Sequence, residues 1–244
     1  MIIAPVENVA QILVVLVLAT AAIIIVKRDI RSLIKTYALQ SLLLAMMALI
    51  FFAETGILTL LFLAVLIIVS KVVVIPYFMG TVQKRLHIKR DMQFHFLSPI
   101  TALFTSVFII LFVYLTFSDL IAPLNIFKGT LFFLGATVGM SIVFMGMIVI
   151  FTRKQTITNI VGYLTMENGV VLFSLFVTDI PLLIEGLIVV DLIMLTLLAT
   201  ILAFGIDSTI EEFHARLNPF QDLTKKLVKI TDIETLDTDE EDKE

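Results

Sequence analysis

The sequence predicts an all-helical, multi-pass membrane protein, and three observations of composition and pattern support this fold class. Apolar residues make up 59% of the 244 residues and charged residues 16%, whereas soluble domains have roughly 45–50% apolar and about 25% charged residues. The apolar residues fall in runs of about 20, a length that crosses the hydrocarbon layer as a helix. Lys and Arg gather in alternate loops. A soluble enzyme, a nucleic-acid binder and a disordered chain are therefore excluded for most of the sequence.

About seven transmembrane helices are expected, with the N-terminus outside and the C-terminus in the cytoplasm. The predicted spans are 6–26, 36–53, 57–80, 99–117, 129–151, 160–178 and 182–205. Prolines mark most span ends, because a residue without an N–H disrupts a helix least at its boundary. The loops after the first and third spans each carry four basic residues, and the loops after the second and sixth carry none. The positive-inside rule therefore places the first and third loops in the cytoplasm.

The spans and charges divide the chain into four segments. Residues 1–80 hold the first three spans, and residues 81–128 hold a basic cytoplasmic loop with the fourth. Residues 129–205 hold the last three spans. Residues 206–244 combine amphipathic stretches with an acidic end, which is typical of a solvated, disordered tail. The alternative for this tail is that its amphipathic stretches lie on the membrane or against a cytoplasmic partner.

The first three spans and the last three show a weak internal similarity. A shift of 126 positions superposes a basic pair, a tyrosine and a third short segment: Lys27-Arg28 on Arg153-Lys154, Tyr37 on Tyr163, and Gln40-Ser41 on Met166-Glu167. Both triplets start outside, so the repeat would be parallel, as occurs in membrane transport proteins. Chance similarity between hydrophobic helices is the alternative.

Four ionisable residues lie well inside the predicted spans, where each bears all or part of a cost of roughly 2.5–3.5 kcal/mol even on the mildest scale. They are Lys71, Glu167, Glu185 and Asp191. Lys71, Glu167 and Asp191 are expected at similar depth, where two acids and a base can pair and reduce each other's desolvation cost. These groups can pass protons laterally, or they can form a fixed ion pair that holds helices together. Glu185, nearer the outer end, can instead extend its carboxylate to the membrane surface.

Pro76 follows Lys71 in the third span and leaves a backbone carbonyl near Val72 without its hydrogen bond. Transporters build ion sites from polar side chains beside an unwound turn of this kind. The alternative is a mild kink without function, which is common in transmembrane helices.

Other patterns indicate packing rather than chemistry. Gly135 and Gly139 form a G-x-x-x-G pattern in the fifth span, which favours close helix packing. The absence of cysteine excludes disulfides, thiolate zinc sites and iron–sulfur clusters held by the chain's own thiolates. The spans contain no nucleophile–base pair, no phosphate-binding glycine loop and no cluster of metal ligands. We therefore expect no catalytic residue, no metal ligand and no cofactor in this chain.

Four stretches of the sequence resemble a known family. They are YALQSL at 37–42, SKVVVIP at 70–76, GYLTMENG at 162–169 and EGLIVVD at 185–191. Together they resemble hydrogenase-4 component E, a membrane subunit of formate-hydrogenlyase-like, group 4 nickel–iron hydrogenases. The resemblance covers essentially the whole chain except the acidic tail.

The last three spans are also similar to the K subunit of respiratory complex I. That family has a basic pair, then a buried glutamate, then a second buried acid in the next helix. Arg153-Lys154, Glu167 and Asp191 follow this order. Glu167 departs from the K-subunit pattern by about one helical turn toward the outside, which keeps roughly the same helix face. Asp191 stands where the K subunit has glutamate.

The resemblance implies a non-catalytic subunit of an oxidoreductase complex in the prokaryotic cell membrane. A soluble hydrogenase arm would carry out the electron transfer, and antiporter-like and quinone-subunit-like membrane subunits would be further partners, with the lipid bilayer and without nucleic acid. The implied proton or ion path consists of Glu167, Asp191, Lys71 and Glu185, with Tyr163, Asn168 and Pro76 in supporting positions. The alternatives are a structural membrane subunit without ion conduction and a subunit of a multisubunit Na⁺/H⁺ antiporter.

Overall fold

The computed structural model describes residues 4–85, 99–121, 129–153 and 156–177, together with residues 189 and 193. All of them belong to one compact unit, Met1–Thr196. These ranges are almost entirely helical and contain no β-strand. The predicted all-helical fold class is therefore confirmed for this part of the chain. The predicted tail, 206–244, lies outside it.

Six helical segments in the described ranges are long and apolar enough to cross a membrane. The elements in chain order are α1 (Ala4–Val26), α2 (Ile30–Thr55), α3 (Leu58–Ile67), η1 (Ile68–Val74), α4 (Ile75–Arg85), α5 (Pro99–Thr116), η2 (Phe117–Ile121), α6 (Thr130–Thr152) and α7 (Thr156–Phe176). The segments α3, η1 and α4 follow one another without a break and form a single membrane-length helix. Six predicted spans thus correspond to helices. The seventh, 182–205, lies outside the described residues, and Glu185 and Asp191 lie there with it.

The start of α2 differs from the prediction, because the helix begins at Ile30 and the predicted span at residue 36. Asp29 caps the helix, and its side chain accepts a hydrogen bond of 3.0 Å from the Ser32 N–H. The first turns of α2 are polar, so hydropathy misses them although they are helical. At the other end Gly56, with φ of 70°, donates its N–H to Phe52 O and ends the helix.

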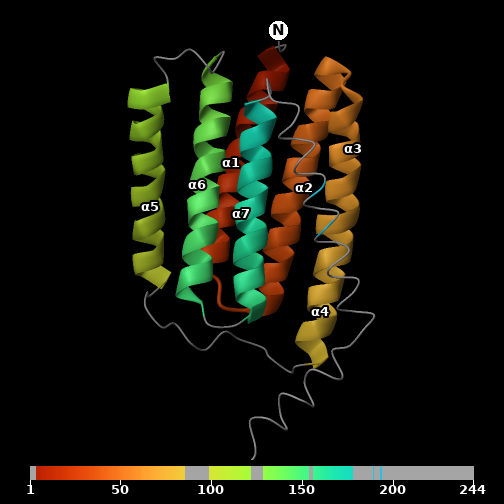
Figure 1. Cartoon of the computed structure of the whole chain (residues 1–244), viewed down its shortest axis with the longest axis vertical. Helices are drawn as coiled ribbons and strands as arrows, with labels where there is room; N and C mark the ends of the chain where they lie inside the picture. Colours follow the sequence, from red (N-terminus) through yellow and green to blue (C-terminus); the bar gives the residue numbers. More distant parts are fainter. Residues whose placement is uncertain are drawn as a thin grey trace, which may run out of the picture. The chain divides into compact units, whose positions relative to one another are not determined.

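Four helices form a closed ring of contacts: α1 packs on α2, α2 on α7, α7 on α6, and α6 on α1. The α3–η1–α4 segment packs on α2, and α5 packs on α6 and α1 (Figure 1). The α7 span is 67% buried and the α5 span only 22%, so α7 is a central helix and α5 a peripheral one. Large apolar side chains are exposed along α5, including Ile100, Phe104, Phe108, Leu111 and Phe112. Such a continuous apolar surface fits lipid rather than water, so the unit is built as a multi-pass membrane bundle.

The backbones of α6 and α7 touch through glycines from both helices. A Cβ added at Gly139 would lie 2.6 Å from Phe173 N, and one at Gly146 would lie 2.6 Å from Met166 N. A Cβ at Gly169 of α7 would lie 2.6 Å from Val143 N. The close packing predicted from the G-x-x-x-G pattern is therefore present. It fixes the position of α7, which carries Glu167.

The helix bounds agree with the shift that the predicted repeat requires. When α1 is shifted by 126 positions, its last residue, Val26, falls on Thr152, the last residue of α6. Arg153, after α6, donates from Nη2 to Ile25 O at 2.8 Å and to Lys27 O at 2.9 Å. The turns after α1 and α6 are thus tied together. The repeat itself stays a prediction, because its last helix lies outside the described residues.

Candidate functional site

Lys71 and Glu167 meet inside the bundle. Lys71 belongs to η1 and Glu167 to α7, and Lys71 Nζ lies 3.4 Å from Glu167 Oε1. The side chains are only 1% and 5% exposed, respectively. The pairing that the sequence suggests for two opposite charges at similar depth is therefore present. Because both groups are out of reach of bulk solvent, their desolvation must be offset by each other and by polar neighbours.

Asn168 connects this ion pair to α2. Its Oδ1 accepts a hydrogen bond of 3.4 Å from Lys71 Nζ. Its Nδ2 donates to Ser41 Oγ at 3.0 Å and to Gln40 Oε1 at 3.2 Å. Asn168, Gln40 and Ser41 are fully buried. Three elements, α2, η1 and α7, therefore converge on one buried polar cluster, which consists of Gln40, Ser41, Lys71, Glu167 and Asn168.

The polar cluster keeps an unused donor on α2. Gln40 Nε2 is buried and has no hydrogen-bond partner among the described residues. Buried amide nitrogens in proteins nearly always have a partner, because an unpaired N–H costs about 1–3 kcal/mol. Among the described residues, the cluster therefore contains a buried donor, Gln40 Nε2, that no acceptor satisfies.

The backbone around Lys71 is a π-helix. The Ile75 N–H donates to Ser70 O, one residue farther back than in an α-helix. Pro76, which has no N–H, follows in the first turn of α4. The unwound turn that the sequence suggested beside Pro76 is not found, since residues 68–74 stay helical as a π-helix. π-helical turns are rare and occur frequently at functional sites.

The remaining predicted site residues lie outside the cluster or outside the described ranges. Tyr163 is half-buried on α7, four residues before Glu167 and therefore on the same side of the helix. Pro76 is half-buried beside η1. Glu185 and Asp191 fall outside the residues that the structure describes.

The sequence prediction did not assign Gln40 and Ser41 to the site. Both lie within the predicted second span, and they are buried by α7. Their signal in the sequence is an adjacent pair of polar side chains in an apolar helix. Uncharged polar residues are tolerated in membranes far more readily than charges, so this signal is weak.

The cluster offers proton exchange rather than bond chemistry. A lysine and a carboxylate at contact distance can share a proton, and the neighbouring amide and hydroxyl groups can accept or donate hydrogen bonds. In the ranges that the structure describes, no three His, Cys, Asp or Glu residues lie together as metal ligands would.

Comparisons with family models, with curated proteins and with solved structures found no match to this chain.

Proposed function

We propose that this chain is a membrane subunit of an energy-converting hydrogenase, or hydrogenase-related, complex of the prokaryotic cell membrane. In this proposal the polar cluster is part of a proton path coupled to electron transfer in a soluble arm. The observation that carries it is the contact between Lys71 and Glu167 inside the membrane bundle. The resemblance of segments 70–76 and 162–169 to hydrogenase-4 component E supports it, because these segments supply both members of the pair.

The geometry of the pair favours proton exchange between Lys71 and Glu167 over a fixed ion pair that only holds the helices together. Lys71 Nζ lies 3.4 Å from Glu167 Oε1 and 3.4 Å from Asn168 Oδ1, whereas charge-assisted hydrogen bonds are typically about 2.7–2.9 Å long. Both of these contacts of the ammonium group are thus longer than a typical charge-assisted hydrogen bond. When a proton passes from Nζ to Oε1, both groups become neutral, and a buried site tolerates the neutral forms readily. The pair can therefore alternate between two proton distributions without exposing a charge to lipid.

The rest of the path follows from the sequence. Asp191 and Glu185 of the last predicted span would carry the proton onward from Glu167, and Tyr163 lies one turn away on α7. The proposal keeps the predicted orientation, with the N-terminus outside, because the basic loops alternate along the chain.

Affinity purification of the full chain from its native membrane in mild detergent tests the proposal. Partners are identified by mass spectrometry, and nickel is assayed. We expect a hydrogenase-like soluble arm, with or without nickel, and antiporter-like membrane subunits. Recovery of the chain alone would contradict the proposal. Recovery with cation-antiporter subunits only would also contradict it, and would favour the antiporter alternative.

A structural subunit is the second candidate function, and the hydrogen bonds of Asn168 favour it. They join α7 to α2 and to η1, as expected of contacts that only hold the helices together. In that case an apolar pair in place of Lys71 and Glu167 would leave a coupled complex fully active, since well-packed apolar residues can replace a buried ion pair. A proton path would lose coupling with the same variant.

A further inference from the structure

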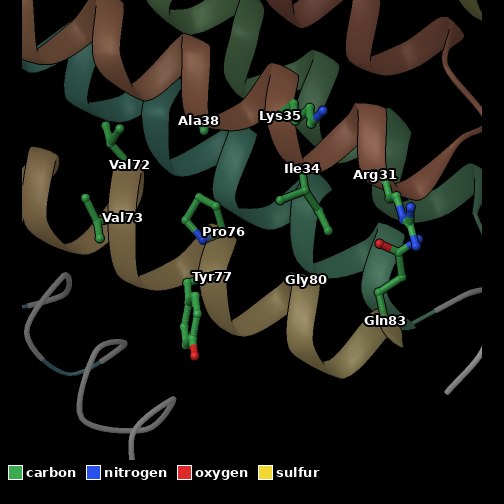
Figure 2. Close-up of a pocket in the computed structure, with 10 residues that line it drawn as sticks. All are labelled: Arg31, Ile34, Lys35, Ala38, Val72, Val73, Pro76, Tyr77, Gly80 and Gln83. Atoms are coloured by element: carbon green, nitrogen blue, oxygen red, sulfur yellow. The ribbon is translucent and has the colours of Figure 1, made fainter. Parts of the chain in front are cut away.

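A groove of about 580 Å³ lies between α2 and the continuous η1–α4 segment, outside the polar cluster. Figure 2 shows the residues that line it, with α2 on one side and η1 and α4 on the other. Its lining comprises Arg31, Ile34, Lys35, Ala38, Val72, Val73, Pro76, Tyr77, Gly80 and Gln83. The groove thus combines apolar walls with two cationic side chains and an amide.

The cations lie on the first turns of α2. Arg31 and Lys35 are both exposed and are four residues apart, so they project from the same side of the helix. The side chains of Arg31 and Gln83 lie next to each other at the same end of the groove (Figure 2). None of the ten lining residues is acidic. This end of the groove is therefore suited to an anion.

The other end of the groove is apolar and open. Val73 is 58% exposed and Tyr77 is 76% exposed, on a helix that is apolar enough to cross the membrane. Gly80 widens the groove, since a Cβ there would meet nothing within 4 Å. The groove therefore extends from a basic helix end along a surface that faces hydrocarbon.

We propose that this groove binds one anionic phospholipid. Arg31 and Lys35 hold its head-group phosphate, and an acyl chain lies along Val72, Val73 and Tyr77. Paired cations suit an anionic head group over a zwitterionic one, and basic pockets between transmembrane helices bind such lipids. The apolar walls require a ligand with a hydrocarbon chain, which free phosphate lacks. The inference rests on the groove alone and not on the proposed hydrogenase function.

Lipid binding to the purified full chain in a non-ionic detergent tests this inference. Fluorescent phosphatidylglycerol is titrated against the wild-type chain, the R31Q/K35Q double variant and R28Q. Arg28 is exposed in the same basic segment but does not line the groove, so R28Q is the matched control. We expect about fivefold weaker binding for each groove cation removed, hence a loss of more than tenfold for the double variant. The R28Q variant should bind within about twofold of wild type, because Arg28 does not line the groove.

A second variant tests the shape of the groove without changing its charge. Gly80→Leu adds an apolar side chain to the groove at a position where a Cβ would meet nothing within 4 Å. We expect a loss of phosphatidylglycerol binding similar to that of R31Q/K35Q, with an unchanged circular dichroism spectrum. Equal binding of phosphatidylcholine and phosphatidylglycerol would overturn the inference, and so would unchanged binding by both groove variants. Equally tight binding of glycerol phosphate, which lacks acyl chains, would show a phosphate site rather than a lipid site.

Discussion

Removing one member of the Lys71–Glu167 pair should destabilise the protein far more than removing both. Both side chains are at most 5% exposed, so neither charge is screened by solvent when its partner is lost. Loss of one partner of a buried ion pair costs about 3–5 kcal/mol, whereas an apolar pair of similar volume is often neutral or stabilising. We therefore expect Glu167→Leu and Lys71→Met each to cost about 3–5 kcal/mol, and the double variant less than about 1 kcal/mol.

A double-mutant cycle measures this difference. The full chain in detergent is unfolded reversibly with increasing denaturing detergent and followed by circular dichroism, since the protein contains no tryptophan. The expected coupling energy is at least about 5 kcal/mol in magnitude, well above the roughly 0.5 kcal/mol within which independent sites add. Glu54→Gln, at the end of α2, is the control and should have little effect. If the two single variants change the unfolding free energy additively, Lys71 and Glu167 do not form a buried ion pair.

Three further predictions concern packing and helix ends, and each is measured as a change in unfolding free energy. Gly139→Ala should cost about 1–3 kcal/mol, because its Cβ would lie 2.6 Å from a backbone nitrogen of α7. Gly80→Ala is the control and should be neutral or stabilising by up to about 1 kcal/mol. Equal effects at the two glycines would refute the close contact between α6 and α7. Arg153→Ala should cost about 1–3 kcal/mol, because the carbonyl groups of Ile25 and Lys27 lose the hydrogen bonds that Arg153 donates to them. An unchanged unfolding free energy would contradict the connection between the ends of α1 and α6. Asp29→Ala should cost about 1 kcal/mol and Asp29→Asn much less, since Asn also caps helices; equal losses would argue against the cap.

The sequence predicted the helices well, and their ends less well, for physical reasons. Hydropathy located the apolar segments because the membrane requires them. It missed the first turns of α2, which are polar but held by the Asp29 cap. It could not show that the turn around Lys71 is a π-helix, because Pro76 is compatible with a kink, an unwound turn or a wider helix.

Part of the candidate site could be predicted from the sequence, because burying a charge in the membrane costs free energy. Lys71 and Glu167 were conspicuous because an isolated charge in hydrocarbon is expensive, so each needed a partner. Gln40 and Ser41 were not, because uncharged polar groups are tolerated at many positions and nothing in α2 alone shows which helix faces them. Their role became visible only from their hydrogen bonds to Asn168.

Proton translocation by the proposed complex is the decisive measurement, and it is made with the Glu167→Gln variant. The complex is assayed in inverted membrane vesicles, with the electron-transfer activity of the soluble arm and the assembly of the subunits measured in parallel. We expect the subunits to assemble, because the amide oxygen of the glutamine can still accept a hydrogen bond from Lys71 Nζ. Electron transfer should continue, and proton translocation should be lost. The Glu54→Gln complex is the matched control, because this glutamate lies at a helix end, and it should translocate protons normally. Normal proton translocation by the Glu167→Gln complex would show that Glu167 is not part of a proton path.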